Sequence, residues 1–224
     1  MLSLINEFKN VIKNFSKGEK IGSAIFIATL IGTQLATGST LISFIASLLG
    51  VIYVILVKKG SRLCYIFGGI QIMLYIYISL SAKFYGDVML NSFNLIMQPI
   101  GFYMWSKRSD NGVVKSNALS IRGLLILFSM WIVTIFLYSF VLKALGGNTP
   151  HIDAMTTVSS ITAMLLSVWA FRDQWIFWLI CNFTSVVMWT LAYFRGDSSA
   201  VPMMIMWTAY SINSIDAVKQ WYSR

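Results

Sequence analysis

Eight long apolar runs constrain the fold of this chain more than any other feature of its sequence. Each run approaches the length of about 20 residues that an α-helix needs to cross a bilayer. Backbone groups in lipid must bond internally, so spanning segments are helices or strands of a closed barrel. Barrel strands alternate polar and apolar residues, and these runs do not. The predicted helical spans are Ile21–Gly38, Thr40–Val57, Leu63–Ala82, Gly86–Trp105, Gly123–Leu142, Ile152–Phe171, Trp175–Phe194 and Ala200–Val218.

The composition agrees with a membrane protein. Hydrophobic residues make up 57% of the 224 residues and charged residues only 11%, whereas about a quarter of a soluble domain is charged. The first run is the weakest, because Thr29, Thr33, Gln34 and Thr37 interrupt it, and an interfacial helix is the alternative there. We therefore predict an all-α membrane protein with a seven-helix core and one extra N-terminal helix.

Basic residues predict the orientation of these helices. If all eight runs span and the N-terminus is cytoplasmic, the inner side holds all 17 basic residues except Lys83, Lys143 and Arg195. Loops rich in Lys and Arg stay in the cytoplasm. We therefore expect both termini in the cytoplasm and the protein in the inner or plasma membrane. Orientation explains the net charge of +9 better than nucleic-acid binding does.

An internal repeat emerges when the chain is shifted by 110 residues. Eight of the 26 positions from 62 to 87 then match, including Arg62 with Arg172 and the Gly-Asp pair at 86–87 with that at 196–197. A single linker helix between two three-helix units gives both units the same orientation, as in parallel repeats of transporters. The predicted organisation is a basic tail and extra helix at 1–39, a first three-helix repeat at 40–105, a linker helix and loops at 106–151, and a second three-helix repeat at 152–224.

The ionisable residues argue against several mechanisms. No acidic residue lies deep in a predicted span, and the single histidine, His151, falls in an outer loop. Cation-coupled carriers usually need ionisable groups at depth, so we expect passive transport. The same inventory argues against metal centres, hydrolysis by paired carboxylates and a serine–histidine mechanism. The sequence thus predicts no enzyme, no cofactor and no metal site.

Uncharged polar and aromatic side chains do lie within the spans. Trp175, Trp178 and Asn182 are spaced i, i+3, i+7, which places them on one helix face. The same spacing recurs twice, at Asn91, Asn94 and Gln98 and at Trp207, Tyr210 and Ser214.

Four polar residues on four helices are predicted to reach the same depth. A rise of about 1.5 Å per residue puts Gln71, Gln98, Asn182 and Tyr210 about 10–12 Å from the inner membrane edge. Pro99 follows Gln98 and can kink its helix, and a broken helix beside polar groups points to a transport site. We therefore expect a polar layer around a cavity.

Structural roles are the alternative for each of these residues. Trp175 lies at a span end, where indole rings often anchor a helix at the membrane interface. An amide such as Asn182 or Gln98 often only bonds a neighbouring helix. Both interpretations remain open at this point.

The predicted layer favours a particular cargo. Indole faces attract flat rings and cations, and amides pair with amide or hydroxyl groups. No Lys or Arg lines the layer, so a phosphate group would not be neutralised. The expected cargo is aromatic, polar, neutral or cationic, and not phosphorylated.

The segment from Trp175 to Asn182 resembles the WxxWxxxN signature of the PnuC-type vitamin transporters. The segments Lys83 to Asp87 and Gln98 to Trp105, and a three-one-three plan similar to that of full-length SWEET transporters, agree with this resemblance. It implies facilitated diffusion of nicotinamide riboside, with net uptake maintained by phosphorylation in the cytoplasm. It also implies that a homotrimer can form.

The resemblance assigns substrate binding to Trp175, Trp178 and Asn182. Position and depth add five further candidates, namely Gln98, Asn94, Gln71, Tyr210 and Trp207. Sister branches of the family carry thiamine or riboflavin, and these remain alternatives. A membrane interaction protein without cargo is the alternative from another class.

Overall fold

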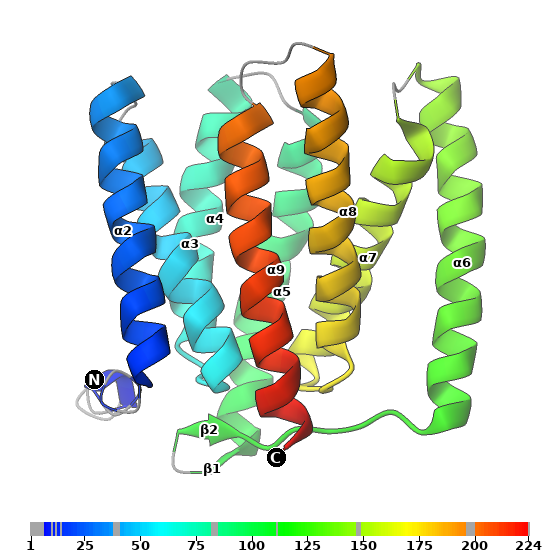
Figure 1. The fold of residues 1–224 in the computed structure, drawn as a ribbon. Coiled ribbons are helices and arrows are strands. Elements are labelled where there is room, and N and C mark those ends of the chain that lie inside the picture. Colours follow the sequence, from blue (N-terminus) through cyan, green and yellow to red (C-terminus); the bar gives the residue numbers. More distant parts are fainter. Residues whose placement is uncertain are drawn as a thin grey trace. The chain divides into compact units, whose positions relative to one another are not determined.

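Long helices occupy nearly all of the chain. The computed structural model describes residues 7–9, 11, 13, 15–37, 41–81, 85–110, 112–146, 149–195 and 200–223. In this part each predicted span coincides, to within a few residues, with one helix (Figure 1). The long helices are α2 (Lys17–Thr37), α3 (Leu41–Lys59), α4 (Cys64–Ser81), α5 (Tyr85–Arg108), α6 (Ile121–Ala144), α7 (Pro150–Val168), α8 (Gln174–Phe194) and α9 (Ala200–Tyr222).

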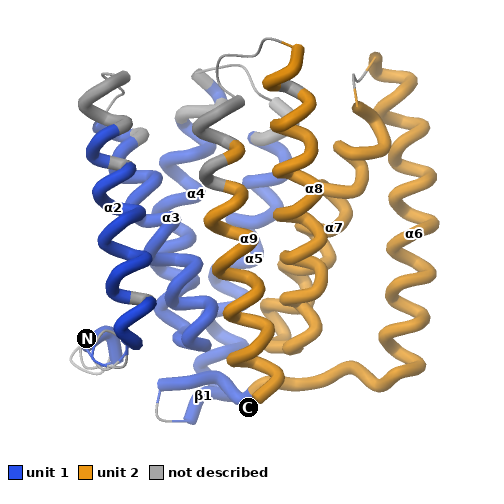
Figure 2. Tube along the Cα trace, in the orientation of Figure 1, with its two compact units in different colours: residues 1–115 blue, residues 116–224 orange. Residues whose placement is uncertain are grey.

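The chain folds into two compact units, residues 1–115 (unit 1) and 116–224 (unit 2) (Figure 2). Within the described residues, two helical stretches, Ile121–Ala144 and Gln174–Leu191, are long and apolar enough to cross a membrane. The remaining predicted crossings stay predictions. The Gly-Asp pair at 196–197, Lys83, and the side chains of Thr33, Gln34 and Thr37 lie outside what the structure describes.

In unit 1, α4 packs against both α3 and α5, and α2 packs against α3. Gly68 of α4 makes this close approach possible. A Cβ atom there would lie 2.6 Å from the Tyr53 ring of α3 and 3.0 Å from the side-chain oxygen of Gln98 on α5. Gly101 of α5 faces the Tyr65 ring in the same way. Small residues therefore join these helices, as is usual where helices pack in membranes.

Helix α5 is not interrupted at Pro99, and the kink that Pro99 can cause stays a prediction. It runs without interruption from Tyr85 to Arg108, with Pro99 inside it. The proline removes one backbone donor, but the loss of a single hydrogen bond does not end a helix of 24 residues.

A short β-hairpin follows α5 and was not predicted. Strand β1 (Ser109–Asp110) pairs antiparallel with β2 (Val113–Val114), so that Ser109 is opposite Val114. Gly112 lies between the strands with φ of +82°, a left-handed conformation that glycine adopts without strain. The Asn-Gly pair at 111–112 is a strong hairpin pattern that the expectation of a plain linker overlooked.

The N-terminal segment is tied to the loop between α3 and α4. The carboxylate of Glu7 accepts hydrogen bonds from Ser61 Oγ at 2.8 Å and from Arg62 Nε at 3.0 Å. Phe8 stacks on Phe67 with ring centroids 5.6 Å apart. A buried anion from outside the predicted repeat thus neutralises Arg62.

In unit 2, α8 packs against α7 and α9, and α6 packs against α7. Phe177 of α8 is fully buried with Ala163 and Leu166 of α7. The α6 ring of Phe128 lies 5.1 Å from that of Phe177. These contacts attach the linker helix to the second predicted repeat.

The loops that precede α4 and α8 share one hydrogen-bond pattern, offset by 110 residues. Gly60 N–H donates to Val57 and Ser61 N–H to Leu56, just as Ala170 donates to Ser167 and Phe171 to Leu166. The next three bonds correspond as well: those of Cys64, Tyr65 and Ile66 match those of Gln174, Trp175 and Ile176. Gly60 and Ala170 also share a positive φ, of 74° and 56°. The backbone of the two units therefore repeats at these turns.

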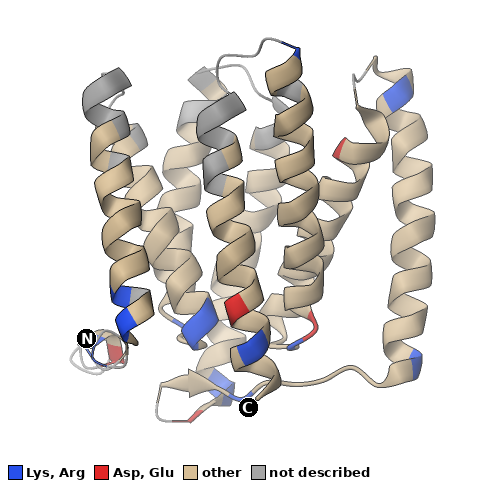
Figure 3. Cartoon of the chain, viewed as in Figure 1, with Lys and Arg blue, Asp and Glu red and all other residues tan. Residues whose placement is uncertain are grey.

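Basic residues of unit 1 lie at the end that carries the hairpin, whereas those of unit 2 lie at both ends (Figure 3). In unit 1 they occupy the last turns of α3 and α5, next to the hairpin. In unit 2, Lys143 lies in the last turn of α6 and Lys219 in the last turn of α9. The distribution in unit 1 is typical of membrane helices oriented by their basic loops, and the orientation itself stays a prediction.

Candidate substrate-binding site

The WxxWxxxN segment forms the first two turns of α8. Trp175 is 3% exposed, and its ring lies edge-on to that of Trp221 at the end of α9, with centroids 6.0 Å apart. Its indole N–H is buried, with no hydrogen-bond partner in the described part of the chain. Trp175 is therefore packed between helices within its unit, rather than exposed as an interface anchor would be.

Trp178 is half-buried and packs against the cluster of Ala163, Leu166 and Phe177. Part of its ring therefore stabilises the contact between α7 and α8, and the rest is accessible within unit 2. The packing role and the proposed binding role are compatible, because an indole ring has two faces.

Asn182 lies deeper in the same helix and is tied to α9. Its Nδ2 donates to Ser214 Oγ at 2.8 Å, and both residues are almost completely buried, with 4% and 2% exposed. Ser211, one turn earlier in α9, instead donates to its own helix at the carbonyl of Trp207, 2.9 Å away. The Asn182–Ser214 bond thus joins two helices through polar side chains in an apolar setting.

Trp207 and Tyr210 form an aromatic pair on α9. Their ring centroids are 5.6 Å apart with planes 84° to each other, an edge-to-face geometry that aromatic rings favour. Both side chains are half-buried. Within unit 2, Asn182 is therefore joined to α9, and Trp207 lies next to Tyr210.

The candidates of unit 1 lie on α5 and α4. Gln98 is 4% exposed, and its Nε2 donates to the backbone carbonyl of Asn94 at 3.2 Å. Its Oε1, and Oδ1 of Asn94, are buried acceptors without a partner among the described residues. Such atoms are costly unless a donor reaches them, by about 1–3 kcal/mol each. Gln71 is half-buried on α4.

Sequence reasoning missed the residues that hold these candidates in place. Gly68 and Gly69 form an adjacent glycine pair inside a span, and such small residues often mark a close helix contact. Trp221 lies beyond the predicted end of the last span, so its contact with Trp175 could not be expected from the pattern.

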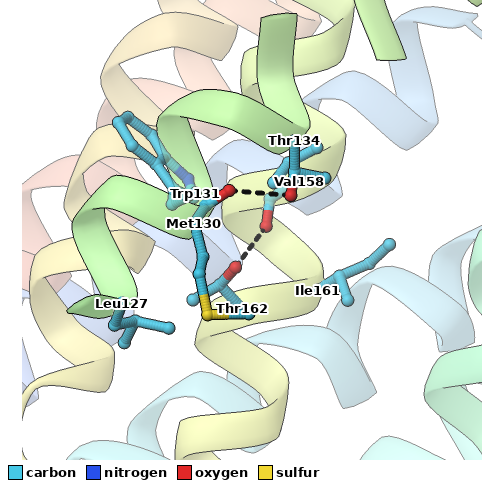
Figure 4. A pocket seen from close by; sticks show the side chains of 7 residues that line it. All are labelled: Leu127, Met130, Trp131, Thr134, Val158, Ile161 and Thr162. Atoms are coloured by element: carbon cyan, nitrogen blue, oxygen red, sulfur yellow. Dashed lines mark hydrogen bonds between the residues drawn. The ribbon is translucent and has the colours of Figure 1, made fainter. Parts of the chain in front are cut away.

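A cavity of about 180 Å³ lies elsewhere in unit 2, between α6 and α7 (Figure 4). Its hydroxyls are already used within their own helices, since Thr134 donates to Met130 O and Thr162 to Val158 O. None of its lining residues belongs to the predicted site. Its apolar walls offer no group that would select a polar cargo. In the described part of the chain, no cluster of His, Cys, Asp or Glu could hold a metal ion.

The arrangement defines an all-α membrane protein, in which amide and indole groups are buried among apolar helices. A family model described as "Nicotinamide mononucleotide transporter" matches residues 40–223. The chain belongs to this family, the PnuC transporters.

Similar proteins support the assignment. The nicotinamide riboside transporter PnuC of Neisseria mucosa is 32% identical over 184 residues, which cover 79% of this chain and 70% of that protein. The protein of the same name from Haemophilus influenzae is 29% identical over 210 residues, covering 91% and 88%. A crystal structure of the vitamin B3 transporter PnuC superposes with a TM-score of 0.81 at 28% identity, over 96% of this chain and 95% of that one.

Proposed function

We propose that this protein transports nicotinamide riboside across the cytoplasmic membrane by facilitated diffusion. The two relatives are named as transporters of this riboside, whereas the family description names the mononucleotide. The candidate residues favour the riboside, because they are uncharged and would leave a buried phosphate unpaired.

The observation that carries the proposal is the Asn182 amide, which is buried on the same face of α8 as Trp175 and Trp178 and is bonded to Ser214 of α9. A pyridinium ring can stack on indole faces, and the positive ring charge adds a cation–π attraction. The carboxamide and ribose hydroxyls can form hydrogen bonds with the amide side chains. We assign substrate binding to Trp175, Trp178, Asn182, Trp207 and Tyr210 of unit 2 and to Gln98, Asn94 and Gln71 of unit 1.

The transport step is proposed to be uniport. No acidic residue of the sequence lies deep in a predicted span, so there is no carboxylate to exchange a proton or bind sodium at depth. Net uptake then depends on phosphorylation of the cargo in the cytoplasm, which removes it from the equilibrium. The proposal also includes the arrangement of two three-helix repeats joined by a linker helix. It further places both termini in the cytoplasm and assembles the protein as a homotrimer.

A ligand panel tests the cargo. Calorimetry on the purified protein should detect nicotinamide riboside and show no comparable binding of nicotinamide mononucleotide, thiamine or riboflavin. Tighter binding of thiamine or riboflavin would reassign the cargo within the family. Equal binding of the mononucleotide would contradict the argument from missing positive charge.

A further inference from the structure

The N-terminal part of unit 1 displays a row of exposed lysines, two of them in the first turn of α2 (Figure 3). The exposed lysines are Lys9, Lys13, Lys17 and Lys20. The same stretch of sequence carries two carboxylates, Glu7 and Glu19, and the first of these is already paired with Arg62. The segment therefore keeps a surplus of positive charge.

The other side chains of this segment pack onto unit 1. Phe8 stacks on Phe67, and Val11 is 8% exposed. The ammonium group of Lys59, at the end of α3, lies over the Phe15 ring, 5.6 Å from its centroid. The segment is thus amphipathic, with its apolar side chains covered by the protein and its lysines accessible. Basic amphipathic segments of this kind lie at the surface of a bilayer.

The exposed face of α2 changes from basic to apolar within one turn. Lys17, Ile21 and Ile25 are four residues apart, which places them on one face of the helix. Ile21 and Ile25 are 60% and 62% exposed. Lys20 is followed in the same way, two turns later, by the exposed Ile27. This face therefore presents ammonium groups at one end and hydrocarbon along the rest of its length.

We propose that this face of unit 1 binds a phospholipid with an anionic headgroup. The lysines attract the headgroup, because an ammonium group pairs with phosphate as a point charge. Each lysine near an anionic lipid surface adds about fivefold in affinity. Ile21 and Ile25 contact the acyl chains. A free phosphate ion would use the lysines alone and leave the isoleucines uncovered, so the combination fits a lipid. The inference does not depend on which cargo the protein carries.

The test compares phosphatidylglycerol with phosphatidylcholine of identical acyl chains. Each lipid is titrated into the purified full-length protein in a non-ionic detergent, and the rise in melting temperature gives an apparent affinity. We expect phosphatidylglycerol to bind about tenfold or more tightly than phosphatidylcholine. High salt should reduce this preference, because it screens exposed charges. Glycerol 3-phosphate, which has no acyl chains, should produce no comparable rise.

A variant with glutamine at the four lysine positions should lose the preference for phosphatidylglycerol, and a variant with arginine there should keep it. The matched control replaces Lys107 and Lys115 of unit 1 with glutamine. Both are exposed, but the first lies over the Tyr103 ring and the second pairs with Asp110. The control should retain the preference.

Equal affinities for the two lipids in the wild type would overturn the proposal. A preference that persists in the glutamine variant, or that the control loses to the same extent, would do so as well. A rise with glycerol 3-phosphate equal to that with phosphatidylglycerol would show an anion site instead of a lipid site.

Discussion

At the scale of single residues, the candidate side chains Trp178 and Gln98 are both packed against neighbouring helices. Trp178 packs against Phe177 and its neighbours yet remains half-buried. Gln98 is buried against the Gly68–Gly69 surface of α4, and its Oε1 has no partner among the described residues. Packing restricts both side chains, and a restricted side chain loses less entropy when it binds a ligand.

Trp178→Ala should weaken nicotinamide riboside binding by about 1–3 kcal/mol, the range for a base stacked on an aromatic ring. Calorimetry on the purified variant measures the change. Trp178→Phe keeps a smaller aromatic face and should lose less. An affinity equal to that of the wild type in Trp178→Ala would remove this residue from the site.

Gly68→Ala should lower riboside affinity about tenfold or more, whereas Gly69→Ala should not. A Cβ at Gly68 would lie within 3.0 Å of Gln98 Oε1 and closer still to Tyr53, so one of them must move. At Gly69 the nearest atom is Gln98 Cγ at 3.7 Å, an ordinary contact. Alanine is a better helix former than glycine, so neither substitution should weaken α4 itself. Equal affinities in the two variants would show that the position of Gln98 does not matter for binding.

At the scale of elements, each unit contains an equivalent turn, and the two turns differ in the residue at the left-handed position. The turn before α4 has glycine at the left-handed position, and the turn before α8 has alanine there. A non-glycine residue in this conformation carries about 1–2 kcal/mol of steric strain. The turn before α8 nevertheless makes the same backbone hydrogen bonds, so Ala170 adopts there a conformation that glycine adopts without strain.

Gly60→Ala should therefore lower the melting temperature, and Ala170→Gly should raise it. Gly60→Ala should lower the free energy of unfolding by about 1–2 kcal/mol. Ala170→Gly should raise it by at most about 1 kcal/mol, because glycine also loses more entropy on folding. Thermal unfolding of the two variants in the same detergent provides the measurement. Changes of the same sign would contradict the shared geometry.

The N-terminal segment stabilises unit 1 through the buried Glu7 carboxylate, so Glu7→Gln should destabilise the protein by about 1–2 kcal/mol. The control is Asp110→Asn. Asp110 pairs with Lys115 at 3.2 Å, but the two side chains are 62% and 74% exposed. Exposed pairs contribute about 0–1 kcal/mol, and we expect little change in melting temperature. Equal effects would mean that Glu7 contributes no more than a surface charge.

At the scale of the whole molecule, hydropathy and breaks in the sequence predicted the helices because apolar length decides where a membrane helix lies. Contacts between helices could not be predicted from the sequence in the same way. Asn182 and Ser214 were each assigned to a polar stripe, but their pairing depends on how α8 and α9 pack. The Glu7–Arg62 ion pair joins residues 55 positions apart, and no local periodicity predicts it.

Passive transport makes a prediction for the whole protein. In liposomes, riboside should equilibrate to the same final level with or without a proton or sodium gradient, because no acidic group lies deep in a predicted span. Radiolabelled uptake measured to completion tests this. Accumulation above the external concentration under either gradient would exclude uniport and require a coupling residue.

The low burial of helix α6 matters for purification of this protein in detergent. Only 6% of its apolar stretch is buried, and its ties to unit 2 include the Trp131–Ser159 bond and the ring contacts with Phe177. In a purified monomer, detergent must therefore cover most of this helix. Short-chain detergents that form small micelles should release α6 from α7 before the other helices separate.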